Sequence, residues 1–292
     1  MSNFEIGVIL PGVGAGIDLR EAARHAEDAG LDGVWHGDHL GAPTLDVTVA
    51  LATAAAATSR VRVGTSVFIP AIRPLAWAAK QVATLQYVSG GRLVLGVGSG
   101  GGPGQWAAAG VPYGERGSRT DTALELFPRL LAGERAEVEG SPVEVAPAVP
   151  MPPVWVGNAS TAAIRRAARL GDGWFPSLIS PGQLAEGTKR LTELAAEHGR
   201  PAPVVAIGAT GALGTGVPSR AEIASGIAGT YGRSVEEVMD IPLTGHPQEA
   251  AEKLAAYREA GARHAVVGIS GGDWPKQVEL LAKVRAILHE TH

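Results

Sequence analysis

The chain has 292 residues, 45% of them hydrophobic and 18% charged, and a formal net charge of −4. This apolar content excludes a chain that is disordered throughout, and the lack of a basic excess argues against nucleic acid as the main partner. The sequence contains no cysteine, which excludes disulfides, thiolate metal sites and a cysteine nucleophile.

The N-terminal segment predicts a strand over residues 5–10. A signal peptide is not expected, because acidic Glu5 precedes the short apolar run and no basic residue does. No stretch of the chain reaches about 18 consecutive apolar residues, so we expect no membrane span. We therefore expect a soluble, cytoplasmic protein.

Short β-rich runs alternate with helix-like segments through the first half of the chain. A helix over residues 17–29 follows the first strand, with Asp18 as its expected N-cap and Gly30 as its C-terminal signal. Pro74 is expected at the first position of a later helix. The further strands are predicted over residues 33–36, 61–69 and 92–97, and the further helices over residues 45–58, 74–88 and 118–131.

The second half repeats this alternation. Strands are predicted over residues 153–156, 173–175, 204–208 and 265–269, and helices over residues 160–170, 181–198, 247–260 and 274–289. Strands and helices in βα order predict a parallel sheet, and closure into a (β/α)₈ TIM barrel is the expected solution at this length. We expect one barrel domain over residues 1–292. An open, doubly wound sheet is the alternative.

Two segments exceed the minimal βα unit. Residues 134–150 are acidic and proline-rich, which predicts an extended excursion or hairpin. Residues 213–245 are expected to form extra helices over 219–228 and 235–239. An insertion between the last two strands would lie at the C-terminal face of the barrel, where βα loops carry function.

The loop after the second predicted strand carries Asp38 and His39 side by side between glycines. Histidine titrates near neutrality, so this pair suits proton transfer or a hydrogen bond to a reactive ring. In the alternative interpretation Asp38 caps the next turn and His39 is a solvated loop residue. His36 and His39 have a spacing that can bind a metal, but no cluster of further ligands supports a metal site.

A glycine-rich run covers residues 96–104 after the fourth strand, and glycine lets backbone N–H groups approach an anion. The run has neither the Walker spacing nor a clear dinucleotide fingerprint, and no helix is expected to begin there. A flexible active-site loop is the alternative. After the fifth strand, the turn from Gly157 to Ser160 precedes a helix that Ser160 or Thr161 can cap, which predicts an anion site at a helix N-terminus. An ordinary helix cap is the alternative here.

These segments resemble the luciferase-like monooxygenase superfamily, especially its branch that uses the deazaflavin coenzyme F420. The resemblance rests on residues 26–40 (AEDAGLDGVWHGDHL), 63–67 (VGTSV), 90–100 (GGRLVLGVGSG), 153–157 (PVWVG), 167–174 (AARLGDGW) and 245–249 (GHPQE), which occur in family order.

The resemblance implies the roles of individual residues. Asp38 would contact the coenzyme, and His39 would lie near the hydride-transfer carbon and stabilise or shuttle charge. Ser66 and Val67 match the position of a non-prolyl cis peptide that backs the ring system. The other implied coenzyme contacts are Ile69, the backbone at Ser99 and Gly100, and a phosphate-binding turn that includes Ala159, Ser160, Ala162 and Ala163.

Two departures narrow the expected chemistry. The sugar-phosphate dehydrogenases of this family have a carboxylate where this chain has Gly101, and a tryptophan where this chain has Pro43 and Thr44. We therefore expect a reductase or dehydrogenase that acts on an apolar or carbonyl-containing small molecule, with His39 as the polar catalytic group. One hypothesis is that Trp106 or Tyr113 closes over the site.

Two rival functions remain open, and a third is disfavoured. A two-component monooxygenase would use FMN and oxygen, with a flavin reductase as partner. A barrel that binds a flavin-like ligand without catalysis is the second rival. A hydrolase or aldolase is disfavoured, because the lysines all fall on predicted helices and no paired carboxylates follow the strands. The family resemblance favours a homodimer.

Overall fold

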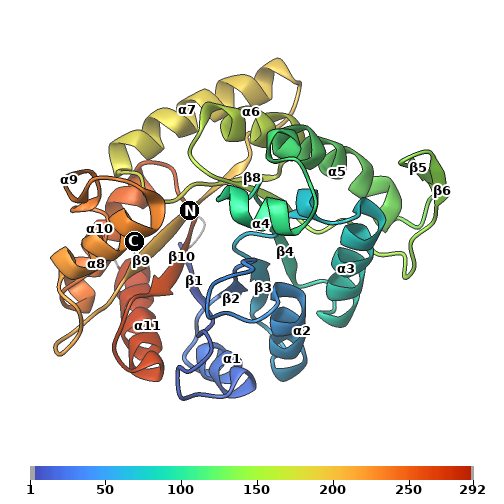
Figure 1. Ribbon diagram of the computed structural model, residues 1–292. Helices are drawn as coiled ribbons and strands as arrows, with labels where there is room; N and C mark the ends of the chain where they lie inside the picture. The colour runs from blue at the N-terminus through green and yellow to red at the C-terminus, as the bar shows by residue number, and fades with distance from the viewer. Residues whose placement is uncertain (1–3, 291–292) are drawn as a thin grey trace.

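The computed structural model describes residues 4–290 and shows eight parallel strands closed into a barrel (Figure 1). The strands follow the order β1-β10-β9-β8-β7-β4-β3-β2, and β1 pairs with both β2 and β10. This closure confirms the TIM barrel and rules out the open sheet. The barrel strands are β1 (Glu5–Ile9), β2 (Gly33–His36), β3 (Arg62–Thr65), β4 (Leu93–Val97), β7 (Val154–Gly157), β8 (Gly173–Phe175), β9 (Val204–Gly211) and β10 (His264–Ile269).

Helices follow the strands around the outside of the barrel. Asp18 caps α1 as expected, because its carboxylate accepts the amide N–H of Arg20. Pro74 occupies the N-cap position of α3 and not the first helical position, which Leu75 takes. The principal helices are α1 (Leu19–Asp28), α2 (Val47–Ala57), α3 (Leu75–Val88), α5 (Arg116–Leu131), α6 (Thr161–Leu170), α7 (Pro181–Glu197), α10 (Pro247–Glu259) and α11 (Trp274–Glu290).

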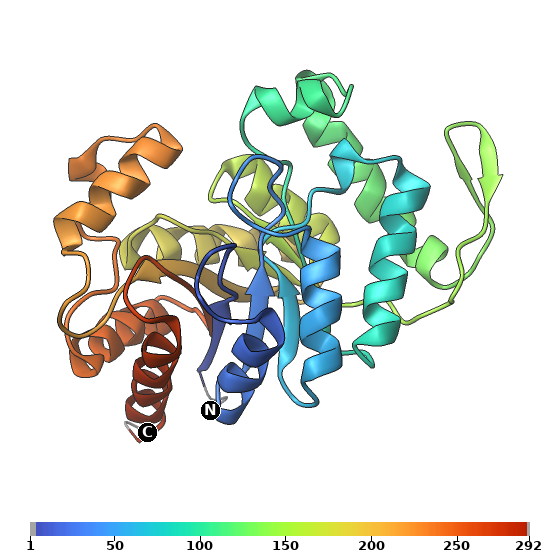
Figure 2. The same ribbon diagram turned by 60° about the horizontal axis from the view of Figure 1, so that its bottom comes forward.

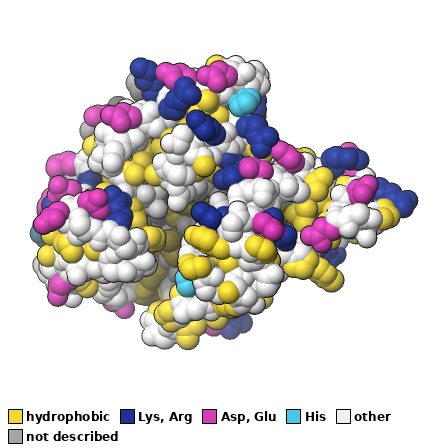
Figure 3. All heavy atoms as spheres, turned by 45° about the horizontal axis from the view of Figure 1, so that its top comes forward, with side chains coloured by type: hydrophobic (Ala, Val, Ile, Leu, Met, Phe, Trp, Pro, Cys, Tyr) yellow, Lys and Arg dark blue, Asp and Glu magenta, His cyan; other side chains and the backbone are white. Residues whose placement is uncertain are grey.

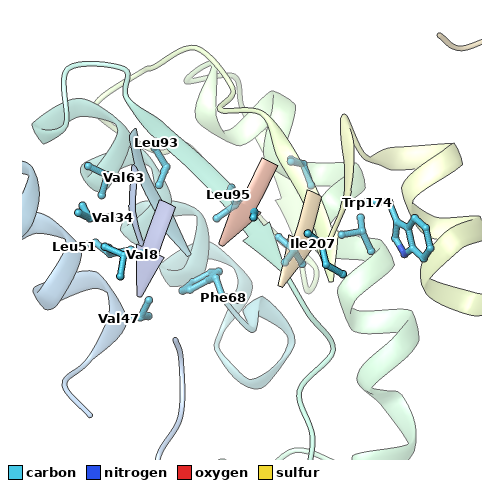
Figure 4. Close-up of a cluster of buried hydrophobic side chains, with 14 of the residues drawn as sticks. Val8, Val34, Val47, Leu51, Val63, Phe68, Leu93, Leu95, Trp174 and Ile207 are labelled. Carbon is cyan, nitrogen blue, oxygen red and sulfur yellow. The ribbon is translucent and has the colours of Figure 1, made fainter. Parts of the chain in front are cut away.

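A continuous apolar layer joins the strands to these helices. Figure 4 shows Val8, Val34 and Val63 of neighbouring strands beside Val47 and Leu51 of α2. All five side chains are fully buried. The alternation of strand and helix in the sequence therefore produces one core between barrel and helices, which holds the strand ends in fixed positions. None of the described helices is long and apolar enough to cross a membrane.

Aromatic side chains pack together inside the barrel. Trp35 and Trp155 stack with ring centroids 5.1 Å apart, and Phe175 packs against both. Glycines on adjacent strands make room for these rings: a Cβ on Gly64 would lie 2.1 Å from the Trp35 ring, and one on Gly173 would lie 2.4 Å from the Trp155 ring. The interior is thus a packed core, as in other TIM barrels. Ligands are therefore expected to bind at the loops that follow the strands.

Strand β3 is shorter than the predicted strand over residues 61–69. The chain leaves the regular ladder after Thr65, at a cis peptide between Ser66 and Val67. Phe68 then forms an isolated bridge to Val97. The prediction was wrong at this end because the apolar residues that follow Thr65 form an irregular bulge and not a continued strand. The cis peptide lies where the family resemblance placed it.

Both predicted insertions are present, on opposite sides of the barrel (Figures 1 and 2). Residues 134–150 form a hairpin of β5 (Ala136–Val138) and β6 (Ser141–Val143), which lies beyond α5. The segment after β9 forms α8 (Arg220–Tyr231) and α9 (Val235–Val238), which have a hydrophobic cluster of their own that includes Ile223, Ile227 and Val238. This insertion contacts the loop after β8, where Arg233 donates a hydrogen bond to the carbonyl of Leu178.

Candidate active site

The loop after β2 is joined to the bulge after β3 by a largely buried ion pair. Arg73 donates two hydrogen bonds to the Asp38 carboxylate, at 2.6 and 2.8 Å, and the amide N–H of Ile69 donates a third at 3.0 Å. The Arg73 guanidinium also lies 4.6 Å from the centre of the Phe68 ring. Both carboxylate oxygens of Asp38 are therefore occupied by protein donors, and the two loops form one rigid unit.

His39 follows Asp38 and is exposed at the end of the barrel. Its Nδ1 accepts the backbone N–H of Gly41 at 3.1 Å and that of Ala42 at 3.0 Å. An imidazole nitrogen that accepts hydrogen bonds carries no hydrogen, so the ring hydrogen of neutral His39 is on Nε2. Nε2 has no partner among residues 4–290. The loop thus presents one free N–H donor to solvent.

His36 stabilises this loop through hydrogen bonds to its last residues. Its Nε2 lies 2.7 Å from the Thr44 hydroxyl and 3.2 Å from the carbonyl of Leu45, and the side chain is buried. Desolvation lowers the pKa of His36, so the ring is neutral near pH 7. Within the described part of the chain, no three His, Asp or Glu side chains are grouped as metal ligands.

Val67 lies across the ends of β4 and β7. A Cβ on Gly98 would lie 2.4 Å from Val67 Cγ2, and a Cβ on Gly157 would lie 2.9 Å from Val67 Cγ1. Glycine is required at both positions because the bulge pushes the Val67 side chain against their backbones. Ser66 and Val67 are both half-buried, and Val67 also packs against the aromatic cluster inside the barrel.

The glycine-rich loop after β4 continues into a short helix, α4 (Pro103–Ala108). The expectation that no helix begins there was wrong, because Pro103 takes a first-turn position in which its missing N–H costs nothing. Ser99 and Gly100 precede this helix and are half-buried, and Gly100 has a φ of +66°.

Trp106 on α4 anchors this loop. Its side chain is fully buried against Ile69 and Ala71, and its indole nitrogen would lie 3.0 Å from a Cβ on Gly100. Tyr113 packs edge-on against Trp106, with centroids 6.1 Å apart. Trp106 is thus held inside the loop and is not free to close over the strand ends, whereas Tyr113 is 38% exposed.

The turn after β7 leads into the N-terminus of α6. Ser160 caps the helix, since its hydroxyl accepts the amide N–H of Ala163, and Asn158 accepts the amide N–H of Ser160. The exposed amides of Thr161 and Ala162 have no acceptor among the described residues. Ala159, half-buried, packs against the core. The cap is confirmed, and two free N–H groups at a helix N-terminus form a surface that suits a phosphate.

Two residues of this arrangement were missed at the level of the sequence. Arg73 lies 35 positions from Asp38, and no local pattern connects the two. Asn158 has a positive φ of 85°. An asparagine before a helix is only a weak sequence signal for such a conformation. Of the residues that were predicted, Asp38 and Gly100 both lie against Ile69. Val67 contacts Gly157, which begins the turn towards Ser160. The hydrogen bonds of His39 within residues 4–290 are to Gly41 and Ala42 of its own loop.

One groove lies away from the strand ends. It has a volume of about 770 Å³ and runs over the outer helices α1, α2 and α3. It contains none of the predicted site residues, so we treat it as a surface feature separate from the strand ends. Figure 3 shows a different view of the surface, in which charges of both signs surround patches of hydrophobic side chains.

The chain is similar in sequence to curated proteins over about half of their length. An uncharacterized protein of Mycobacterium tuberculosis is 35% identical over 170 residues, which is 56% of this chain and 58% of that protein. An F420-dependent glucose-6-phosphate dehydrogenase of Beutenbergia cavernae is 37% identical over 167 residues, which is 51% of this chain and 49% of that protein.

Solved structures share the fold over nearly the whole chain. An F420-dependent secondary alcohol dehydrogenase superimposes with a TM-score of 0.82 at 18% identity, covering 97% of this chain and 98% of that one. The oxygenating constituent of a 3,6-diketocamphane monooxygenase of Pseudomonas putida, in complex with FMN, has a TM-score of 0.75 at 18% identity and covers 98% of both chains.

The sequence model of the luciferase-like monooxygenases matches residues 11–231. This match includes the loops after β2, β3, β4 and β7, which carry the candidate site residues. The oligomeric state, a reductase partner and the cytoplasmic location stay predictions. The chain belongs to the luciferase-like monooxygenase family.

Proposed function

We propose that this protein is an oxidoreductase that transfers a hydride between the deazaflavin coenzyme F420 and a small organic substrate. The observation that carries the proposal is the unit formed by Asp38, His39 and Arg73. It holds a free imidazole N–H beside an apolar bulge at the strand ends. Curated and structural relatives that use F420 support the choice of coenzyme.

The residues at the strand ends fit a flat ring system joined to a phosphate. Half-buried Val67 would supply apolar surface, with buried Ile69 packed beneath the loop after β4, and the backbone of Ser99 and Gly100 would supply polar groups. When bound, the coenzyme supplies the hydride chemistry. The phosphate would bind at the turn after β7, where Thr161 and Ala162 have free N–H groups. The proposed coenzyme contacts are Asp38, Ser66, Val67, Ile69, Ser99, Gly100, Gly157, Ala159, Ser160, Ala162 and Ala163.

The proposed role of each residue follows from its position. Asp38, with both oxygens held by Arg73 and Ile69, orients the loop. His39 offers a hydrogen bond at Nε2 to the reacting atoms. Val67 and the buried Trp106 exclude water from one side of the site.

An FMN-dependent monooxygenase with a separate flavin reductase is the second candidate. The observation in its favour is the FMN-bound neighbour with the same fold. Since FMN also carries a planar ring and a phosphate, the same turn after β7 would serve either coenzyme.

Titration of the protein with F420 and separately with FMN, followed by fluorescence, tests the proposal. We expect micromolar or tighter binding of F420 and much weaker binding of FMN. The reverse preference would establish the second candidate. Binding of neither coenzyme would refute both.

Thr161→Pro sharpens this test. Proline fits the first position of a helix and removes a single N–H, and the extended conformation of Ser160 is compatible with a following proline. Loss of one hydrogen bond to a charged phosphate costs about 1.5–3 kcal/mol, so we expect roughly 10-fold or greater weakening. Val235→Pro, at the first position of α9, is the matched control and leaves coenzyme binding unchanged.

We also propose that the protein forms a homodimer through the outer face of α2 and α3. Helix α2 has no charged residue, and a helix that is apolar on all sides is normally buried. The groove on this face is lined by small side chains such as Ala52 and Ala56 and by Trp77, which is 67% exposed, and Arg20, Arg24 and Lys80 also line it. In a two-fold arrangement each Trp77 can fill the groove of the other copy, which makes the face complementary to itself.

Trp77→Glu is expected to convert the dimer to a monomer, measured by sedimentation or light scattering. The substitution removes the indole that would fill the groove of the other copy, and loss of a large aromatic side chain from the centre of an interface costs about 2 kcal/mol or more. Tyr87→Glu is the matched control, because Tyr87 is on the same helix and equally exposed at 67% but does not line the groove. A monomeric wild type, or a Tyr87→Glu variant that dissociates equally, would contradict this assignment.

A further inference from the structure

We infer that the substrate binds at the ends of β8, β9, β10 and β1, and that it is an uncharged organic molecule held by the hydroxyls of Ser177, Thr210 and Ser270. The inference rests on the proposed function, because it assigns the part of the strand ends that the coenzyme leaves free. It names the class of the substrate and three residues that select it.

The order of the strands divides the mouth of the barrel, where the strands end, into two halves. All proposed coenzyme contacts lie at or after the ends of β2, β3, β4 and β7, which are neighbours in the closed barrel. The strands β8, β9, β10 and β1 are also neighbours and form the second half. The insertion of α8 and α9 and the loop that carries α4 rise beyond the strand ends on opposite sides (Figure 2). A molecule that meets the coenzyme at the mouth therefore has this second half on its other side.

The inward faces of β9 and β10 end in hydroxyl groups. Ala206 of β9 and Val266 of β10 belong to the aromatic cluster inside the barrel. Because side chains alternate along a strand, Thr210 and Ser270, each four positions further on, lie on the same inward face. Their hydroxyl oxygens are 2.8 Å apart. Either hydroxyl can rotate to donate or to accept, so the pair suits an alcohol or a carbonyl oxygen of a ligand.

Ser177 adds a third hydroxyl beside this pair. It lies two positions beyond Phe175 of the same aromatic cluster and forms an isolated bridge to Gly208 of β9. Its side chain is exposed, and its hydroxyl has no hydrogen-bond partner among residues 4–290. Ser177 can therefore bind a ligand without giving up a bond within the protein.

Apolar side chains lie beneath these hydroxyls. A Cβ on Gly208 would lie 3.6 Å from the Phe175 ring, and one on Gly268 would lie 3.6 Å from Ile9 Cδ1 and 3.5 Å from the Thr210 hydroxyl oxygen. Since both positions are glycine, no side chain of β9 or β10 covers Phe175 and half-buried Ile9 there. The second half of the mouth thus combines apolar surface with a few hydroxyls, which is the usual lining of a site for a small molecule.

The loops of this half carry no charge. Residues 10–17, 176–180, 212–219 and 270–272 contain no Asp, Glu, Lys, Arg or His. Asp273 follows the last of these loops and adds a negative charge. A phosphate or carboxylate on the substrate would lose hydration here without gaining a cation, which is costly.

The nearest cations of the insertion are already paired. Arg233 donates a hydrogen bond to the carbonyl of Leu178 at 2.6 Å, and its Nε lies 3.6 Å from the Glu237 carboxylate. Arg220 lies 3.9 Å from the Asp240 carboxylate. Neither arginine is free to receive an anionic substrate, so hydroxyl contacts and apolar packing decide which molecules bind.

The first test compares ligands of one shape that differ in charge. Cyclohexanol, cyclohexanone and 1-phenylethanol are the uncharged probes, and cyclohexanecarboxylate and cyclohexylammonium are the charged ones. Each is titrated into ¹⁵N-labelled protein, with and without bound F420, and backbone amide shifts are followed. We expect the uncharged probes to shift the amides of Thr210 and Ser270, and the charged probes to leave them unchanged. Equal shifts from the carboxylate, or no shift there from any uncharged probe in either form, would overturn the inference.

The second test introduces a cation at the mouth. Ser270→Lys places an ammonium beside Thr210 at an exposed position. Because a hydrogen bond to a charged group is stronger than a neutral one, we expect cyclohexanecarboxylate to bind at least about 10-fold more tightly than to wild type. Thr192→Lys, on the exposed face of α7, is the matched control and should show no gain. An equal gain in both variants, or no gain in Ser270→Lys, would contradict the assignment.

The third test separates the substrate from the coenzyme. Thr210→Val keeps the shape of the side chain and removes its hydroxyl, and Thr192→Val is the matched control. We expect Thr210→Val to bind the uncharged probes about 3- to 10-fold more weakly, with F420 affinity unchanged. Equal probe affinity in Thr210→Val and wild type would overturn the role of this hydroxyl. Failure of the wild type to bind F420 would instead refute the proposed function, while the titrations without coenzyme would still show whether the second half of the mouth selects uncharged molecules.

Discussion

Gly64→Ala is expected to destabilise the barrel by at least about 3 kcal/mol, at the upper end of what overpacking costs. The added Cβ would lie 2.1, 2.3 and 2.4 Å from three atoms of the Trp35 ring. The ring cannot move aside, because it stacks on Trp155 and its indole nitrogen already fills the space that a Cβ on Gly7 would need. Chemical unfolding monitored by circular dichroism measures the change.

Gly101→Ala is the matched control for this substitution. Nothing lies within 4 Å of the position that its Cβ would take, so the free energy of unfolding should change by less than about 0.5 kcal/mol. Trp35→Leu introduced together with Gly64→Ala should restore part of the lost stability, since it removes the atoms that clash. A Gly64→Ala protein as stable as wild type would show that the two positions are not in the contact described.

Arg73→Gln is expected to cost about 3 kcal/mol of stability and to weaken coenzyme binding as well. Arg73 and Asp38 are 17% and 10% exposed, and removal of one member leaves the other as a buried charge without its partner. The loop that carries His39 would keep the hydrogen bond from the Ile69 amide to Asp38, but it would lose the bonds through which Arg73 ties Asp38 to the carbonyl of Ile69. Thermal unfolding and F420 titration measure the two effects separately.

Two further variants separate the local effect from a general loss of stability. Asp38→Asn added to Arg73→Gln removes the uncompensated charge and should recover part of the stability but not the coenzyme affinity. Arg285→Gln breaks the two hydrogen bonds to Asp32, at 2.7 and 2.8 Å, beside the start of β1. This control should lower stability and leave F420 affinity unchanged. If both arginine variants weaken F420 equally, the Arg73 pair has no special role at the site.

Much of the fold could be predicted because its signals are local. The helix after β1 begins at the aspartate that caps it, and the strand over residues 33–36 has the predicted bounds. The positions of Asp38, His39 and Ser160 followed from the rule that function in a barrel lies after the strands.

The remaining features depend on contacts between distant segments. The end of β3 depends on how Val67 packs against Gly98 and Gly157, and a pattern of apolar residues cannot show this contact. The role of Asp38 as a partner of Arg73 likewise arises only when the loops after β2 and β3 meet. The family resemblance supplied the location of the cis peptide, which local propensity does not indicate.

The close packing of Trp35 against glycines inside the barrel limits which substitutions this sequence can accept. Any substitution that enlarges position 7, 33 or 64 is tolerated only if Trp35 becomes smaller first, because all three glycines border that one ring. Single steps along this path are each unfavourable, so these four positions would be expected to vary together or not at all. The loop of residues 98–104 is free of this coupling at Gly101 and Gly104, where nothing is within reach of an added Cβ and the backbone does not require glycine. New substrate preferences can therefore arise at the rim while the interior stays unchanged.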